Sequence, residues 1–109
     1  MANVYKNAKV DLTTTDNTTV YTAPSNSRAI VKNILVSDDS GSGDSINVTL
    51  TDASAAVFSL FKTKTIGSNA TTELINHPII LQESEILKAQ ATTAGRLHIV
   101  VSLLEINRD

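Results

Sequence analysis

The chain has 109 residues, of which 41% are hydrophobic and 18% charged, with a formal net charge of −2 and no cysteine. This length suits one domain that buries a core without metal or disulfide, and the absence of cysteine excludes thiolate metal sites and a cysteine nucleophile. The small acidic charge gives no support for nucleic-acid binding through a basic patch.

No segment approaches the roughly 18 apolar residues that cross a bilayer, and the N-terminus lacks the apolar run of a signal peptide. We therefore expect a complete, soluble and unprocessed chain with no membrane partner. Residues 1–12 are predicted to form an N-terminal arm or a first edge strand, and residues 13–109 a single β-sandwich domain. Four residues of the N-terminal segment are candidates for contact with a neighbouring molecule: Val4, Tyr5, Val10 and Leu12.

Beyond this segment, apolar and polar residues alternate with period 2 in short stretches that turn residues separate. Residues 18–22 form the next predicted strand. Residues 28–36 form a longer one with apolar side chains on both faces, which is typical of a strand between packed sheets or at a subunit contact. Its two faces are predicted to carry Ile30, Ile34 and Val36 on one side and Val31 and Leu35 on the other.

Residues 45–52 show the most regular alternation, so we expect Ile46, Val48 and Leu50 on a buried face and the intervening polar residues in solvent. The polar residues 37–45 that precede this strand are predicted to be the tip of a hairpin. Shorter strands are predicted at residues 56–63, 71–75 and 85–91.

The last predicted strand, residues 96–106, is mostly apolar on both sides, and residues 92–95 indicate a hairpin that pairs it with residues 85–91. The total is about eight or nine short strands, and no stretch has the 3.6-residue period of a helix. This pattern predicts an all-β fold, a sandwich or a barrel, with an antiparallel β-sandwich as the expected architecture.

Three carboxylates, Asp38, Asp39 and Asp44, lie close to two glycines in residues 37–45, a composition from which a cation site could be built. The regular calcium loop needs acids at positions 1, 3 and 5, glycine at 6 and glutamate at 12. Counted from Asp38, positions 3 and 5 are serines and position 12 is Thr49, so the pattern fails. An ordinary loop is the favoured interpretation, and a cation site of irregular geometry is the alternative.

Candidates for catalysis are few. His77 precedes a proline in a turn and His98 lies in the middle of a strand, and neither placement indicates a catalytic base. Glu83 and Glu85 stand two positions apart, which puts them on one face of an extended strand and not on opposite sides of a substrate. We therefore predict a non-enzymatic protein without a cofactor.

Residues 19–37 read TVYTAPSNSRAIVKNILVS, and this segment resembles the opening of small virion structural proteins of tailed bacteriophages. Residues 78–81, 86–91 and 102–106 look like the second half of the same pattern, so the resemblance covers most of the chain after Leu12. Where the pattern has Gly-Asp before the penultimate strand, this chain has Ser84-Glu85, which disfavours a tight left-handed turn there.

The resemblance implies a jelly-roll-like fold and a structural role in a virion assembled in the host cytoplasm. The first hypothesis is a capsid decoration or cement protein that contacts the major capsid protein or other virion proteins, acts as a homo-oligomer and binds no nucleic acid. The second is a tail, neck or fibre-base component. A carbohydrate- or cation-binding sandwich that uses the acidic loop is a third hypothesis, from another class.

Overall fold

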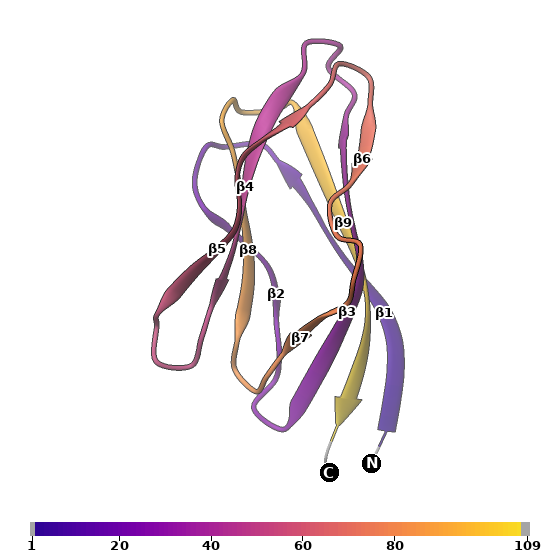
Figure 1. Ribbon diagram of the computed structural model, residues 1–109, viewed down its shortest axis with the longest axis vertical. Coiled ribbons are helices and arrows are strands. Elements are labelled where there is room, and N and C mark those ends of the chain that lie inside the picture. Colours follow the sequence, from indigo (N-terminus) through magenta and orange to yellow (C-terminus); the bar gives the residue numbers. More distant parts are fainter. Residues whose placement is uncertain (1, 108–109) are drawn as a thin grey trace.

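The computed structural model describes residues 2–107, and every regular element within them is a β-strand (Figure 1). The strands are β1 (Ala2–Leu12), β2 (Thr18–Thr22), β3 (Ser27–Asp38), β4 (Asp44–Thr51), β5 (Val57–Ile66), β6 (Thr71–Glu73), β7 (Ile79–Leu81), β8 (Ile86–Ala91) and β9 (Leu97–Asn107).

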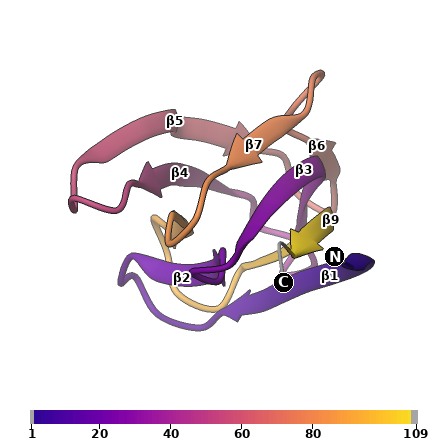
Figure 2. The same ribbon diagram turned by 90° about the horizontal axis from the view of Figure 1, so that it is seen from below.

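These strands form two antiparallel sheets that face each other, as the view from below shows (Figure 2). Sheet A has the order β1-β9-β3-β6, with β7 also paired to β3, and sheet B has the order β2-β8-β4-β5. Because β6 and β7 pair with different parts of the same strand, they are two pieces of one interrupted strand. Counted as one, they give two four-stranded sheets with the strand order of a jelly roll. The predicted all-β, jelly-roll-like sandwich is thus confirmed.

Two predicted hairpins are wrong. Residues 39–43 join β3 of sheet A to β4 of sheet B, and residues 92–96 join β8 of sheet B to β9 of sheet A. In both cases the chain crosses between the sheets, so the strands before and after the loop face each other across the common core. Strands β4 and β5 do form a hairpin, closed by residues 52–56.

The core lies between the sheets and consists of one cluster of buried side chains. Central strand β9 contributes alternate residues to it, and β4 contributes Ile46 and Val48, as the alternation predicts. The largest fully buried side chains are Leu12, Ile34, Ile46, Ile66, Leu81, Leu87, Leu97, Ile99, Leu103, Val31, Val36 and Val48.

Strand β3 departs from the predicted division of its faces because a bulge shifts its register with β9 between Val31 and Asn33. One extra residue reverses the alternation from that point. Val31 is therefore buried together with Ile34, although they were predicted on opposite faces. Ile30 and Leu35 lie together on the outer face.

The turn before β8 is left-handed in spite of its sequence. Ser84 has a φ of 67°, and its N–H donates to the carbonyl oxygen of Ala23 over 2.9 Å. The N–H of Glu85 donates to the carbonyl oxygen of Gln82 over 3.1 Å and closes the turn. The expectation that Ser84 disfavours such a turn is wrong, because these contacts hold a conformation that glycine would adopt more readily.

Candidate assembly surface

A row of apolar side chains crosses the outer face of sheet A. Tyr5 of β1 pairs with Leu104 of β9, Leu104 pairs with Ile30 of β3, and Ile30 pairs with Ile80 of β7. Directly paired residues of an antiparallel sheet point to the same face, so these four side chains lie side by side. Tyr5 is 75% exposed and Ile80 52%. The row therefore presents apolar surface that this chain does not cover.

A second apolar level lies further along the same face. Val100 of β9 pairs with Lys9 on one side and with Leu35 on the other, and it is 37% exposed. Between the two apolar levels runs a polar one, where Ser102 lies between its neighbours on β1 and β3. The face thus has two apolar bands separated by a narrow polar band.

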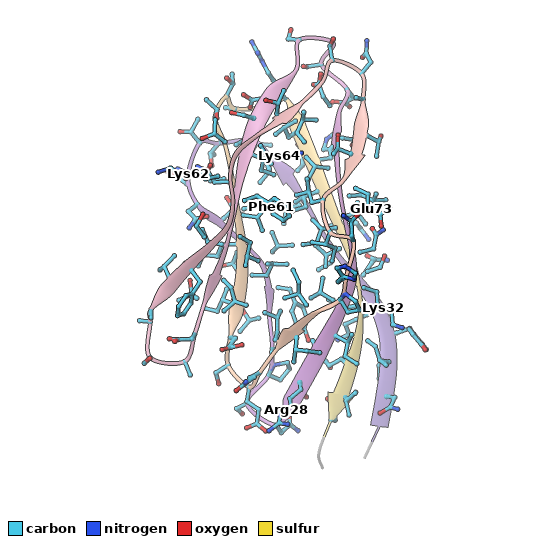
Figure 3. The ribbon with its side chains drawn as sticks, viewed as in Figure 1. Arg28, Lys32, Phe61, Lys62, Lys64 and Glu73 are labelled. Carbon is cyan, nitrogen blue, oxygen red and sulfur yellow. The ribbon has the colours of Figure 1, made fainter. Side chains whose placement is uncertain are left out.

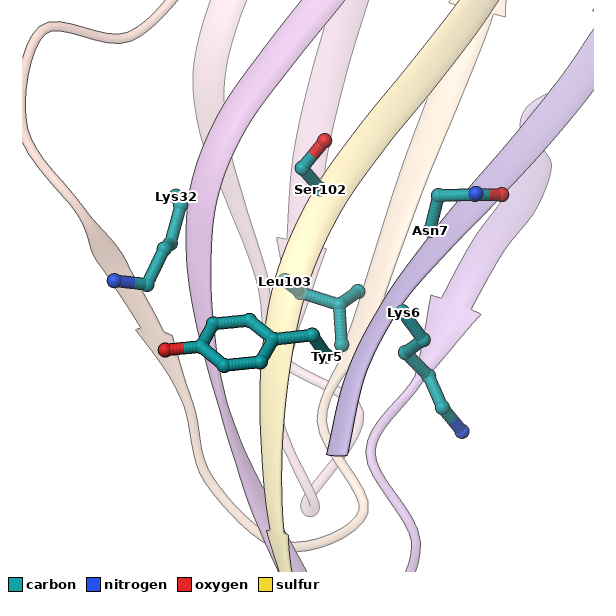
Figure 4. Close-up of a pocket in the computed structure, with 6 residues that line it drawn as sticks. All are labelled: Tyr5, Lys6, Asn7, Lys32, Ser102 and Leu103. Atoms are coloured by element: carbon teal, nitrogen blue, oxygen red, sulfur yellow. The ribbon is translucent and has the colours of Figure 1, made fainter. Parts of the chain in front are cut away.

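The Tyr5 side chain lies across this face, although it remains 75% exposed. Figure 4 shows its ring crossing β9 toward Lys32 of β3, and the Lys32 amine is 6.0 Å from the ring centroid. At this distance the ammonium is attracted to the ring. The two side chains, with Asn7 and Ser102, border a shallow depression of 320 Å³. The depression occupies the polar band next to the first apolar row.

Charge is distributed unevenly along the face. Arg28 lies toward the end that carries Leu104, and Lys32 lies in the bulge near the middle of the face (Figure 3). Glu73 pairs with Leu35 at the other apolar level, where Lys9 pairs with Val100. Beyond Glu73, the acidic end is completed by Asp11, which pairs with His98.

His98 lies between two carboxylates at this acidic end. Its Nε2 atom is 3.2 Å from Oδ1 of Asp11, and its Nδ1 atom is 3.8 Å from Oδ2 of Asp39. Both ring nitrogens of His98 therefore face carboxylates.

The four N-terminal candidates fall into two pairs. Leu12 is 1% exposed and Val10 packs against the core, so both are used within this chain. Val4 is 39% exposed and Tyr5 75%, so both remain accessible to a neighbouring molecule. Strand β1 that carries them is an edge strand whose pairing in this chain is with β9.

Two further exposed apolar side chains lie on the β4–β5 hairpin, one on each face of β5. Val57 and Phe58, at the start of edge strand β5, are 61% and 54% exposed. Further along the strand, Phe61 packs against the core while Lys62 is exposed (Figure 3). Phe58 therefore lies outside the core.

The acidic loop is organised around Asp38, which is 3% exposed. Its carboxylate accepts hydrogen bonds from the Ser40 hydroxyl (2.5 Å) and from the backbone N–H groups of Ser40, Gly43 and Asn69 (3.0, 2.7 and 3.2 Å). These donors, the Ser40 hydroxyl foremost, lower the pKa of Asp38 to about 2. The carboxylate therefore holds this crossover loop against residues 67–70.

The other two acids of this segment have separate contacts. Asp44 accepts a hydrogen bond from the Thr93 N–H over 2.8 Å, which ties the two inter-sheet loops together. Asp39 faces His98. Within the described residues, no group of three or more potential ligands is arranged to hold a metal ion.

The remaining catalytic candidates lie in turns. His77 is exposed between β6 and β7, and the Glu85 carboxylate accepts a hydrogen bond from the Gln82 N–H over 2.8 Å in the turn before β8. In residues 2–107 there is no helix long and apolar enough to cross a membrane.

One buried charge was not foreseen. Glu105 is 6% exposed and points between the sheets, where it accepts a hydrogen bond from the Tyr21 hydroxyl (2.5 Å) and lies 3.3 Å from the Lys6 amine. Burial and the neighbouring carboxylate raise the pKa of Tyr21. The alternation along β9 could have predicted this burial, because Glu105 lies two residues after buried Leu103 and therefore on the same inner face.

The fold and this surface define the protein as a small single jelly roll with an uncovered apolar face on one sheet. No protein-family model and no curated protein matches the sequence.

Solved structures match the fold at low sequence identity. A chain from the acid-stable capsid of Helicobacter pylori bacteriophage KHP30 is 11% identical with a TM-score of 0.60, and the match covers 97% of this chain and 89% of that one. A chain from the Bacillus endospore appendages that form disulfide-linked pili is 9% identical with a TM-score of 0.58, over 98% and 89%. A chain of infectious bursal disease virus, Gx strain, is 10% identical with a TM-score of 0.56, but this protein spans 29% of its length.

Proposed function

We propose that this protein is a non-enzymatic virion structural protein, and more specifically a capsid decoration or cement protein that stabilises contacts between shell subunits. The observation that carries the proposal is the match to a bacteriophage capsid chain over nearly the whole length of both chains. It means that a single jelly roll of this size occurs as a capsid component. The resemblance of residues 19–37 to small virion proteins of tailed bacteriophages supports the same role.

The surface chemistry suits a protein that works by docking. Only 18% of the residues are charged, so few ions need to be desolvated when the surface is covered. Val57 and Phe58 on the β4–β5 hairpin and Val4 on β1 expose apolar side chains on two edge strands. In this proposal these edges contact the major capsid protein or other virion proteins.

Rebinding to a stripped shell tests the proposal. The purified protein is added to particles from which it has been removed, and the shell's resistance to heat or chelator is measured. We expect wild type to restore resistance and the Val57→Ser, Phe58→Ser double variant to bind at least tenfold more weakly. Lys62→Ser on the same strand is the matched control and should bind like wild type. If the wild-type protein bound no shell, the proposed decoration role would be wrong.

A tail, neck or fibre-base position is the second candidate, and the match to a pilus-forming chain over 98% of this protein favours keeping it. The two positions predict different copy numbers: hundreds per particle for a shell component and a few to a few dozen for a tail component. Quantitative mass spectrometry of intact particles distinguishes them.

A carbohydrate- or cation-binding role has less support, because Asp38 and Asp44 already accept hydrogen bonds within their loops. Calorimetric titration of wild type, Asp39→Ala and Asp44→Ala with calcium would test it. A heat of calcium binding that wild type shows and the two variants lose would support the cation-binding role.

A further inference from the structure

The outer face of sheet A is built in levels, each a set of residues that pair directly with one another across the strands. We propose that a second copy of the chain covers this face, related by a two-fold axis that runs along the strands, midway between β9 and β3. The axis lies in the plane between the two copies. The inference goes beyond the virion role and does not depend on it.

An axis in this position keeps each level of the face opposite the same level of the second copy. It exchanges the strands across the face, so β9 lies opposite β3 of the second copy, and β1 lies opposite its β6 and β7. In such a two-fold contact every pair of residues occurs twice. The residues at the two edges of one level therefore have to match each other.

The first argument is the match of the two apolar levels. Read across the sheet, the first of them consists of Tyr5, Leu104, Ile30 and Ile80. The axis places Leu104 opposite Ile30 of the second copy, and Ile80 opposite the strand that carries Tyr5. At the other apolar level, it places Val100 opposite Leu35 of the second copy. Apolar side chains thus meet apolar side chains at both levels.

The second argument is charge complementarity at the edges of the Val100 level. Across the sheet, this level begins with Lys9 on β1 and ends with Glu73 on β6, and both residues are exposed. The Glu73 carboxylate accepts a hydrogen bond of 2.6 Å from Nδ2 of Asn33 on β3. The axis brings Lys9 of each copy opposite Glu73 of the other, so two ion pairs flank the apolar contacts.

The twist of the sheets leaves these ion pairs within reach. Stacked sheets lie about 10 Å apart and cross at about 30°. Lys9 and Glu73 each lie about 7 Å from the axis, so this crossing shifts them relative to each other by about 4 Å along the strands. A lysine side chain is long enough to span that shift.

The third argument concerns Tyr5, which is 75% exposed in one chain. Its ring crosses β9 toward β3 (Figure 4), and the axis lies between these two strands. The Tyr5 rings of the two copies therefore meet close to the axis and cover each other. The Lys32 amine, 6.0 Å from the ring centroid, lies at the border of this aromatic pair, and its attraction to the ring offsets part of the cost of covering the charge.

At the ends of the face, charged groups meet neutral ones. At the His98 level, the axis places Asp11 opposite Thr71 of the second copy and His98 opposite its Ser37, so hydroxyl groups face the carboxylate and the imidazole. Arg28 at the other end lies over β9 of the second copy. Its aliphatic part packs there, while the guanidinium extends into solvent.

The size of the face is adequate for a stable dimer. Strand β9 pairs over eleven positions with β1 and over eleven with β3, and β6 and β7 add three positions each. At about 3.4 Å per residue and about 4.8 Å between strands, these strands span on the order of 600 Å² in projection. The accessible area of such a corrugated surface is larger and approaches the ~800 Å² per partner of a standard interface.

A charge swap tests the proposal in the full chain, with sedimentation velocity over a concentration series as the readout. We expect a wild-type dimer and at least tenfold weaker dimerisation for Lys9→Glu and for Glu73→Lys, because each change places like charges opposite each other twice. The Lys9→Glu, Glu73→Lys double variant should recover most of the loss. Lys64→Glu, exposed on β5 of sheet B, is the matched control and should dimerise like wild type.

Circular dichroism shows whether each variant is folded. Three outcomes of the charge swap would overturn the proposal: a strictly monomeric wild type, single variants that dimerise like wild type, or a folded double variant that dimerises no better than the single variants.

Cross-linking tests the direction of the axis independently, since the described residues contain no cysteine. Ser102 and Ser37 lie next to the axis at different levels, so each faces its own copy at about 11 Å between Cα atoms. A short bis-maleimide should therefore link the copies in Ser102→Cys and also in Ser37→Cys. Thr19→Cys, exposed on sheet B, is the control and should remain unlinked at the same protein concentration. Linking of only one of the two face positions, or equal linking of Thr19→Cys, would exclude this axis.

Discussion

Tyr21 and Glu105 join the two sheets through a hydrogen bond of 2.5 Å between the phenol and a buried carboxylate. Lys6 lies 3.3 Å from the same carboxylate and supplies the opposite charge. A charge buried at this depth is tolerated only with such partners.

Removal of the Tyr21 hydroxyl should therefore destabilise the fold. We expect Tyr21→Phe to lower the free energy of unfolding by about 1–3 kcal/mol, because the buried carboxylate loses a donor. Urea denaturation measures the change. Tyr5→Phe is the matched control, since that side chain is 75% exposed, and a loss of equal size in both variants would contradict the role of the buried pair.

The same pair predicts alkaline sensitivity. The pKa of Tyr21 is raised above its ordinary value of 10.0, chiefly by burial and next by the hydrogen bond to Glu105. A group whose folded pKa is raised contributes stability that is complete below its unfolded pKa and declines as the pH rises above it. We expect the melting temperature of wild type to fall more steeply above pH 10 than that of Tyr21→Phe. Parallel slopes would argue against this linkage.

The lowered pKa of Asp38 predicts that the fold loses stability at low pH. Its pKa is lowered to about 2 from 3.8 by the Ser40 hydroxyl and three backbone N–H groups, so its contribution is complete above pH 3.8 and is lost as the pH falls toward 2. Thermal melts between pH 7 and pH 2 should show Asp38→Ala less stable than wild type at neutral pH, with the difference shrinking in acid. Asp39→Ala, whose side chain is 70% exposed, should melt like wild type throughout.

Gly43 is predicted to be intolerant of a side chain. Its φ is +72°, and an added Cβ would lie 3.1 Å from the carbonyl oxygen of Ile66. Gly95 has a φ of +78° but open space around it, so Gly95→Ala carries the backbone strain alone, about 1 kcal/mol. We expect Gly43→Ala to lower the free energy of unfolding by roughly 1–3 kcal/mol more than Gly95→Ala does. Equal losses would show that the loop shifts to make room.

Neighbouring leucines on β9 separate folding from association. Leu103 is 2% exposed in the core, whereas Leu104 lies on the outer face. Leu103→Ala should cost about 2–5 kcal/mol in denaturant titrations. Leu104→Ala should cost much less within one chain but weaken dimerisation in sedimentation. If Leu104→Ala left dimerisation unchanged, the outer face would not be the interface.

The sequence by itself determined the class of fold and the position of most strands. Period-2 alternation in residues 45–52 correctly placed Ile46 and Val48 in the core, because side chains of a strand alternate between its faces whatever the strand pairs with. Both faces of β9 were correctly described as largely apolar for the same reason. The exposed row on sheet A was foreseen only as apolar side chains on both faces of residues 28–36, a pattern that also occurs at subunit contacts.

Which strands pair with one another, and in which register, was decided by the tertiary structure. Loop composition predicted that residues 37–45 form a hairpin, but a polar loop has the same composition whether it joins paired strands or crosses between sheets. The bulge after Val31 is equally invisible in the sequence, since it depends on how β3 pairs with β9. That single extra residue puts Ile30 and Leu35 on the same outer face. Long-range pairing therefore built the surface on which the proposed association depends.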